Sequence, residues 1–174
     1  MSMSIKPQDV VVALKLSAGA AARNYAKLGK ELGMSASEVH AAVRRLGEAR
    51  LLDPETKKVR LEVFRNFLVH GVPYAFPASP KEITRGIPTA WAASPLSQKI
   101  SADGQPPPVW PSPDGKVQGA AVQPLHPGVP GAAQRDPVLY ALLALVDALR
   151  MGRARERALA EKEIGQRLAH HAGA

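Results

Sequence analysis

The sequence contains no cysteine, which excludes disulfides, thiolate zinc sites, iron–sulfur clusters and a cysteine nucleophile. Aromatic residues make up only 5% of the chain, and the longest apolar run, residues 138–146, ends at Asp147. That run is too short to span a membrane, and residues 1–12 lack the basic and apolar segments of a signal peptide. We therefore expect a cytoplasmic protein without a membrane segment.

Positive charge and proline are both abundant, but in different parts of the chain. The 174 residues include 23 Lys and Arg against 15 Asp and Glu, a formal charge of +8. Residues 1–70 hold 12 basic and 7 acidic residues, whereas 14 of the 16 prolines lie between Pro73 and Pro137. Because excess positive charge favours an anionic partner, we expect residues 1–70 to contain its binding site.

Three short helices are predicted within the first 50 residues. Pro7 suits the first turn of a helix, where its missing N–H is not needed. Asn24 is a good N-cap for a second helix, and Gly33 is a good residue to end it. Ser35 followed by Glu38 forms a capping-box pattern at the start of the third helix, residues 35–49.

The third helix has a single apolar stripe with the i, i+4, i+7 spacing of buried positions. Its members are Val39, Val43 and Leu46. Residues 53–56, Asp-Pro-Glu-Thr, are a turn signal, and Lys57 and Lys58 follow them. We expect a short β-hairpin over residues 53–60 and a further helix over residues 59–70.

This order of elements resembles a winged helix-turn-helix domain, including that of the MarR-like (multiple-antibiotic-resistance regulator) family, over about residues 5–70. The short second helix, the glycine turn, the capped third helix and the basic hairpin carry the resemblance. It implies a transcription regulator that binds double-stranded DNA, with residues 35–49 as the recognition helix in the major groove and residues 53–60 as the wing.

With its apolar stripe facing inward, the third helix turns four other side chains outward, where they can read bases. They are Ser37, His40, Ala41 and Arg44. Arginine binds guanine bidentately, histidine can donate or accept at a base edge, and alanine permits contact with a thymine methyl. Phosphate contacts are expected from the helix start and from flanking basic residues. These are Ser35, Lys27, Lys30, Arg45, Lys57 and Lys58.

Several of these residues have a second interpretation that the sequence leaves open. His40 is equally consistent with a solvated histidine, and Glu38 fits a cap residue better than a base reader. Tyr25 can pack beneath the third helix or touch a phosphate, and Lys57 and Lys58 can be solvated turn residues. The same three-helix arrangement also occurs in proteins that bind other proteins.

Residues 72–135 cannot form a long helix, because proline or glycine interrupts every window of fifteen residues. We expect an irregular segment with short strands, one of them over residues 73–76, and polyproline II over residues 106–111. Trp91 and Trp110 are expected to anchor this segment to a core.

Residues 136–174 are predicted to form two helices. Asp136 and Pro137 are suited to the N-cap and first helical position, and the helix that follows is the most apolar in the chain until Gly152 interrupts it. Its apolar positions exceed one narrow stripe, so it requires burial on several sides. Either a homodimer interface or packing against residues 10–16 and 63–68 of the same chain would bury these apolar side chains.

We therefore expect a mainly α protein with a DNA-binding domain (1–71), a proline-rich segment (72–135) and a C-terminal helical segment (136–174). No histidines lie at metal-ligand spacing with carboxylates, and no nucleophile elbow or glycine-rich phosphate loop occurs. We expect no enzyme activity, no metal and no cofactor. The alternative to DNA binding is a protein-interaction module, such as an antitoxin-like adaptor, that binds a partner protein through residues 72–174.

Overall fold

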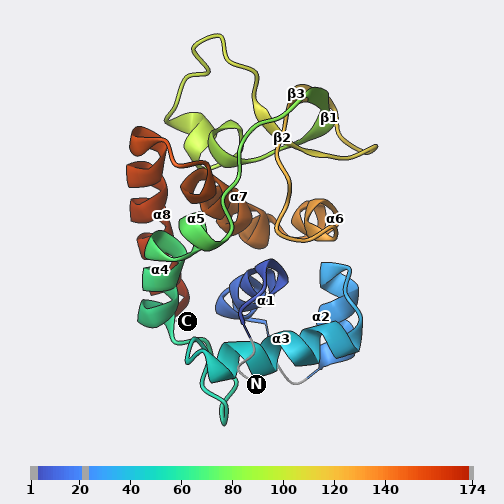
Figure 1. Cartoon of the computed structure of the whole chain (residues 1–174), viewed down its shortest axis with the longest axis vertical. Coiled ribbons are helices and arrows are strands. Elements are labelled where there is room, and N and C mark those ends of the chain that lie inside the picture. The colour runs from blue at the N-terminus through green and yellow to red at the C-terminus, as the bar shows by residue number, and fades with distance from the viewer. Residues whose placement is uncertain (1–3, 21–23, 173–174) are drawn as a thin grey trace.

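The computed structural model describes residues 4–20 and 24–172; the outermost residues of the predicted ranges 1–71 and 136–174 lie outside this description. The helices are α1 (Pro7–Ser17), α2 (Tyr25–Leu32), α3 (Ala36–Glu48), α4 (Leu61–His70), α5 (Val72–Ala75), α6 (Val129–Arg135), α7 (Pro137–Met151) and α8 (Ala154–Ala172). The strands are β1 (Ile83–Pro88), β2 (Pro108–Pro111) and β3 (Val117–Ala121), with 3-10 turns η1 (Ala90–Ala92) and η2 (Leu96–Gln98). The mainly α prediction is confirmed. Figure 1 shows α1 beneath α6 and α7, with α2 and α3 around it and the strands at the opposite end of the molecule.

The predicted ends of α2 and α3 are confirmed. The Asn24 side chain accepts a hydrogen bond from the Lys27 N–H at 2.9 Å, and Gly33 ends α2 in the left-handed conformation with φ 71°. Ser35 and Glu38 form the expected capping box. These short-range bonds satisfy backbone groups that a helix leaves without partners at its ends.

After α3 the chain makes a hairpin loop. Its turn, predicted at residues 53–56, is stabilised by the Asp53 carboxylate, which accepts hydrogen bonds from the N–H groups of Glu55 and Thr56. A single β-bridge, between Leu52 and Val59, closes the loop. The hairpin therefore contains one bridging pair in place of two strands.

The strand predicted for residues 73–76 is wrong. The chain continues from α4 into the short helix α5, because Gly71 keeps dihedrals close to helical values, with φ −111° and ψ −53°. Pro73 lies in the first turn of α5, where proline is tolerated. Val72 is fully buried, whereas Tyr74 is 75% exposed.

The polyproline II conformation predicted for residues 106–111 is wrong from Pro108 onward, where the chain forms β2. β1 pairs antiparallel with both β2 and β3, β2 pairs parallel with β3, and the three strands close on themselves. Val109 and Trp110 are fully buried, so side-chain packing favours the strand. Backbones approach closely here, since a Cβ on Gly86 would lie 2.2 Å from the Trp110 carbonyl oxygen.

The helix α7 lies at the centre of the core. Leu139 and every residue from 141 to 150 are buried, and α7 packs against α1, α4, α5, α6, α8 and η1. Of the two alternatives for this helix, packing within the chain is therefore the one observed. The core is contiguous and includes residues from all three predicted ranges.

A buried polar cluster joins α7 to the strands. The Asp147 carboxylate accepts hydrogen bonds from Thr89 Oγ1 and Trp110 Nε1, both at 2.7 Å, and from an Arg150 N–H at 2.6 Å. Arg150 also donates to two main-chain carbonyl groups. The prediction that Trp91 and Trp110 anchor the segment is confirmed, because both are buried. No helix in the described part of the chain is long and apolar enough to cross a bilayer.

Candidate nucleic-acid interface

The four predicted base-reading residues lie on the solvent side of α3. Ser37, His40 and Arg44 are exposed, and Ala41 is half-buried. The predicted stripe on the opposite side is at most 2% exposed. In the ranges 4–20 and 24–172, no ion pair includes Arg44. The structure thus brings these four residues together on one accessible helix face.

The start of α3 is held by reciprocal hydrogen bonds. Ser35 Oγ accepts from the Glu38 N–H at 3.1 Å, and the Glu38 carboxylate accepts from the Ser35 N–H at 2.7 Å. The bond from the Ser35 backbone lowers the pKa of Glu38, so this carboxylate is ionised at neutral pH. Glu38 is therefore a cap. The Ser35 hydroxyl group also interacts with the Glu38 carboxylate, so a phosphate would compete with this carboxylate for the hydroxyl proton.

His40 lies against Tyr25, with ring centroids 5.5 Å apart and planes tilted by 48°. Tyr25 is half-buried and packs on the core from the first turn of α2. Tyr25 therefore packs on the core, as the first of its two interpretations expects. This contact limits the directions in which the exposed His40 imidazole can point.

The prediction that Arg45 contacts phosphate is wrong. Arg45 is 6% exposed, and its guanidinium donates two hydrogen bonds of 2.7 Å to the Asp9 carboxylate. These bonds raise the pKa of Arg45 above its ordinary value. The pair fixes α3 against α1, and the Asp9 carboxylate also accepts from the Lys6 N–H at 2.8 Å. Arg45 is buried because it lies on the inner side of α3, beside Ala42 and Leu46.

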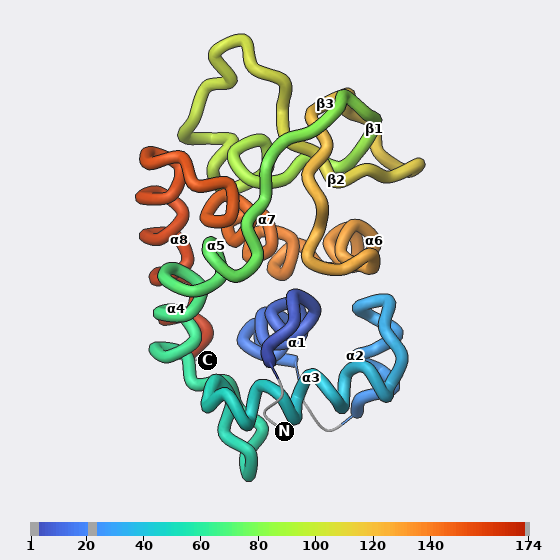
Figure 2. The backbone as a smooth tube through the Cα atoms, in the orientation of Figure 1, coloured from blue at the N-terminus to red at the C-terminus, as the bar shows by residue number. Residues whose placement is uncertain are grey.

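The remaining predicted phosphate contacts lie at the two ends of α3. Lys27 and Lys30 are exposed on α2, while Lys58 is exposed and Lys57 half-buried in the hairpin. Figure 2 shows α2 at one end of α3 and the hairpin protruding beyond the other. Phosphates on both sides of a groove that held α3 would therefore meet positive charge.

Two basic residues near the hairpin were not among the predicted contacts. Arg50 follows α3 with φ 62° and is exposed. Arg60 is also exposed, and its N–H donates to the Leu51 carbonyl group at 2.9 Å, which brings it beside the end of α3. Their positive charge was visible in the sequence. The bridge between Leu52 and Val59, which brings residues 50 and 60 to the same end of the hairpin, was not.

The loop before α6 packs on the turn between α2 and α3. A Cβ on Gly128 would lie 2.1 Å from the Leu32 carbonyl oxygen, so the two backbones are in direct contact. Arg135 donates a 2.8 Å hydrogen bond to the carbonyl group of Glu31. In the same loop, burial lowers the pKa of His126. Residues 72–135 thus hold α2 and the turn before α3 in position.

The groups that the α3 face and its flanks offer are hydroxyl, imidazole, guanidinium and ammonium groups, which bind phosphates and base edges. Within the described ranges, no group of three or more His, Asp or Glu side chains is arranged to hold a metal ion. Comparisons of the chain with protein-family models, with curated proteins and with solved structures found no match.

Proposed function

We propose that the chain binds double-stranded DNA sequence-specifically, as a transcription regulator that places α3 in the major groove. The observation that carries this proposal is the outer face of α3, where Ser37, His40, Ala41 and Arg44 are accessible on a capped helix. These are side chains that read base edges. The hairpin over residues 53–60 acts as the wing, and the regulator acts in the cytoplasm.

Phosphate contacts from both ends of α3 supply affinity that does not depend on sequence. We assign them to Lys27, Lys30, Lys57, Lys58 and the Ser35 hydroxyl group. Arg45 contributes indirectly, because its ion pair with the buried Asp9 holds α3 at a fixed angle to α1.

Selection of bound DNA from a random pool tests the proposal. With the recovered sequence, Arg44→Ala should weaken binding by about 1–3 kcal/mol and relax the preference at one base position. Lys57→Ala should weaken all sequences alike and reduce the salt slope by about 1. Arg155→Ala, at an exposed arginine of α8, is the control and should change neither. If no sequence is enriched, or if Arg44→Ala binds as the wild type does, the proposal is wrong.

The homodimer expected from the sequence would need a surface other than α7, because α7 is enclosed by its own chain. The selected DNA also tests this point. A palindrome with half-sites about one helical turn apart indicates two copies on the duplex. A single asymmetric site, with one chain per duplex in sedimentation, would remove the homodimer from the proposal.

The second candidate function is protein interaction through residues 72–174. It is favoured by Tyr74 and Ile83, which are 75% and 59% exposed in this part of the chain. In affinity capture with the full chain, Tyr74→Ser should then lose a stoichiometric partner that Arg44→Ala retains. Capture that is unchanged in Tyr74→Ser would count against this role.

A further inference from the structure

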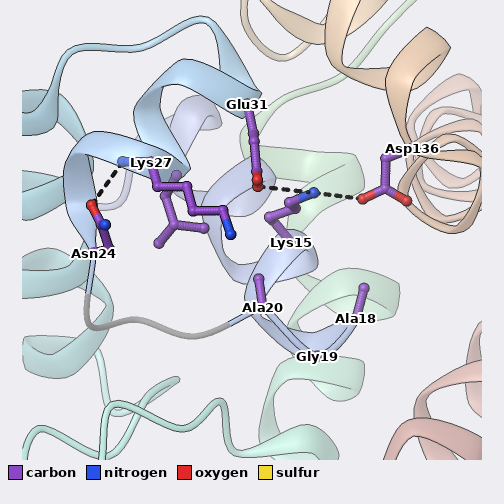
Figure 3. Close-up of a pocket in the computed structure, with 9 residues that line it drawn as sticks. Lys15, Ala18, Gly19, Ala20, Asn24, Lys27, Glu31 and Asp136 are labelled. Atoms are coloured by element: carbon purple, nitrogen blue, oxygen red, sulfur yellow. Dashed lines mark hydrogen bonds and ion pairs between the residues drawn. The ribbon is translucent and has the colours of Figure 1, made fainter.

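A cavity of about 540 Å³ lies between the end of α1, the helix α2 and the start of α7. Figure 3 shows the side chains around it. Among the described residues, the polar ones are Lys15, Asn24, Lys27, Glu31 and Asp136. The volume is typical of small-molecule sites, and apart from Lys27 these residues have no part in the proposed DNA contacts.

The two carboxylates of the cavity are already paired. The Lys15 ammonium group donates to Asp136 at 2.6 Å and lies 3.4 Å from Glu31. The other Asp136 oxygen accepts from the Leu139 N–H at 3.1 Å. Among the described residues that line the cavity, a cationic ligand would therefore find a single carboxylate oxygen without a partner, on Glu31, whose charge is already partly neutralised by Lys15.

Besides this Glu31 oxygen, the polar groups that the described lining residues leave without a partner are donors. Asn24 uses its carbonyl oxygen to cap α2 through the Lys27 N–H, which leaves its amide NH2 group to donate. The Lys27 side chain extends from α2 toward Lys15 and Ala20 (Figure 3), and it belongs to no ion pair formed within the described residues. Ala18 and Ala20 supply apolar wall.

We propose that this cavity binds a small organic carboxylate. Its anionic head accepts hydrogen bonds from the Lys27 ammonium group and the Asn24 amide, and its apolar body lies against Ala18 and Ala20. Such a bond between a charged donor and a carboxylate is stronger than one between neutral groups. This site is separate from the outer face of α3.

One consequence of the site rests on the proposed DNA binding. Lys27 cannot neutralise a DNA phosphate while its ammonium group is bound to a carboxylate in the cavity. The ligand also contacts α2, which leads directly into the turn before α3. Binding of the carboxylate should therefore lower the affinity for DNA.

The test uses three probes with the same six-carbon chain: hexanoate, hexanamide and hexylamine. Their binding to the full chain without DNA is measured by 1H–15N NMR titration at constant pH and ionic strength. Hexanoate should bind with saturation at millimolar concentration and about tenfold more tightly than hexanamide, as expected for one charge-assisted hydrogen bond. Hexylamine should bind more weakly than either.

Lys27→Ala should remove the preference for hexanoate, whereas Lys30→Ala, at an exposed lysine of α2 that does not line the cavity, should retain it. The carboxylate site is overturned if hexanoate fails to saturate, if the three probes bind alike, or if Lys27→Ala keeps the preference.

A second measurement adds hexanoate to the complex with selected DNA. It should weaken binding of the wild type and leave the complex of Lys27→Ala unchanged. If hexanoate binds the free protein without affecting DNA, the competition is refuted and the carboxylate site stands. If no DNA is bound in the absence of hexanoate, the failure belongs to the proposed function alone.

Discussion

Arg44 and Arg45 are adjacent in α3, and substituting each by alanine should give opposite results. Arg44 is exposed and belongs to no ion pair within the described ranges, whereas Arg45 is buried against Asp9. We expect Arg45→Ala to lose stability. Arg44→Ala should keep stability and lose DNA affinity.

The size of each change in stability follows from the groups that the substitution leaves without a partner. Arg45→Ala removes both hydrogen bonds to an Asp9 carboxylate that is fully buried. Leaving a buried charge without its partner costs about 3–5 kcal/mol, a large share of the roughly 5–15 kcal/mol that stabilises a domain. An exposed side chain such as Arg44 contributes within about 0.5 kcal/mol.

Urea unfolding at pH 7, followed by tryptophan fluorescence and circular dichroism, measures the change in unfolding free energy of both variants. A double-mutant cycle identifies the cause. In Asp9→Asn combined with Arg45→Met, no buried charge is left alone, and the amide oxygen introduced at position 9 can still accept from the Lys6 N–H. The loss of unfolding free energy in the double variant should be smaller than the sum of the losses in Asp9→Asn and in Arg45→Met. Strict additivity, or a loss below about 1 kcal/mol in Arg45→Ala, would refute the reasoning.

Three further substitutions test the packing around the site. Asp147→Ala leaves Arg150 and the Trp110 N–H without their partner, so unfolding in urea should show a loss of about 3–5 kcal/mol; a loss near zero contradicts this. Gly128→Ala places a Cβ 2.1 Å from the Leu32 carbonyl oxygen and should cost about 1–3 kcal/mol of stability. In the control Gly47→Ala the nearest contact is an ordinary 3.7 Å, so this substitution should stabilise α3 by about 0.5–1 kcal/mol. Thermal unfolding compares the two variants. Burial acts to raise the pKa of Asp136, but the hydrogen bonds from Lys15 and the Leu139 N–H lower it below its ordinary value. The ionised carboxylate therefore stabilises the fold above about pH 4, and this stabilisation is lost as the pH falls through the lowered pKa. Asp136→Asn should flatten that part of the stability profile, and an unchanged acid slope would exclude the carboxylate as its source.

The helix ends near the candidate site were predictable from sequence because their causes are local. Asn24, Ser35 and Glu38 bond to backbone groups three residues away, and Gly33 adopts a conformation that glycine favours. The spacing of the apolar stripe then determines which face of α3 points outward. That is why the four positions predicted to read bases lie together on one face.

Arg45 could not be assigned in the same way, because its burial depends on a residue 36 positions earlier. The sequence did contain one sign of it. Asp9 lies in the first turn of a helix whose next residues are Val10, Val11 and Val12, and an acidic side chain in so apolar a setting requires a partner. Identifying that partner required knowledge of how α1 crosses α3.

The apolar helix α7 shows a second limit of local patterns. Apolar residues on several faces predict burial on several sides. The same apolar pattern results whether a second copy or the same chain supplies the covering surface, so the pattern does not distinguish the two. Here the covering comes from α1, α4 and α8, and from α5, η1 and α6 within the proline-rich segment. Gly128 and Arg135 also bring that segment onto α2. The orientation of α3 therefore depends on residues far outside 1–71, and the candidate site is a property of the whole described fold.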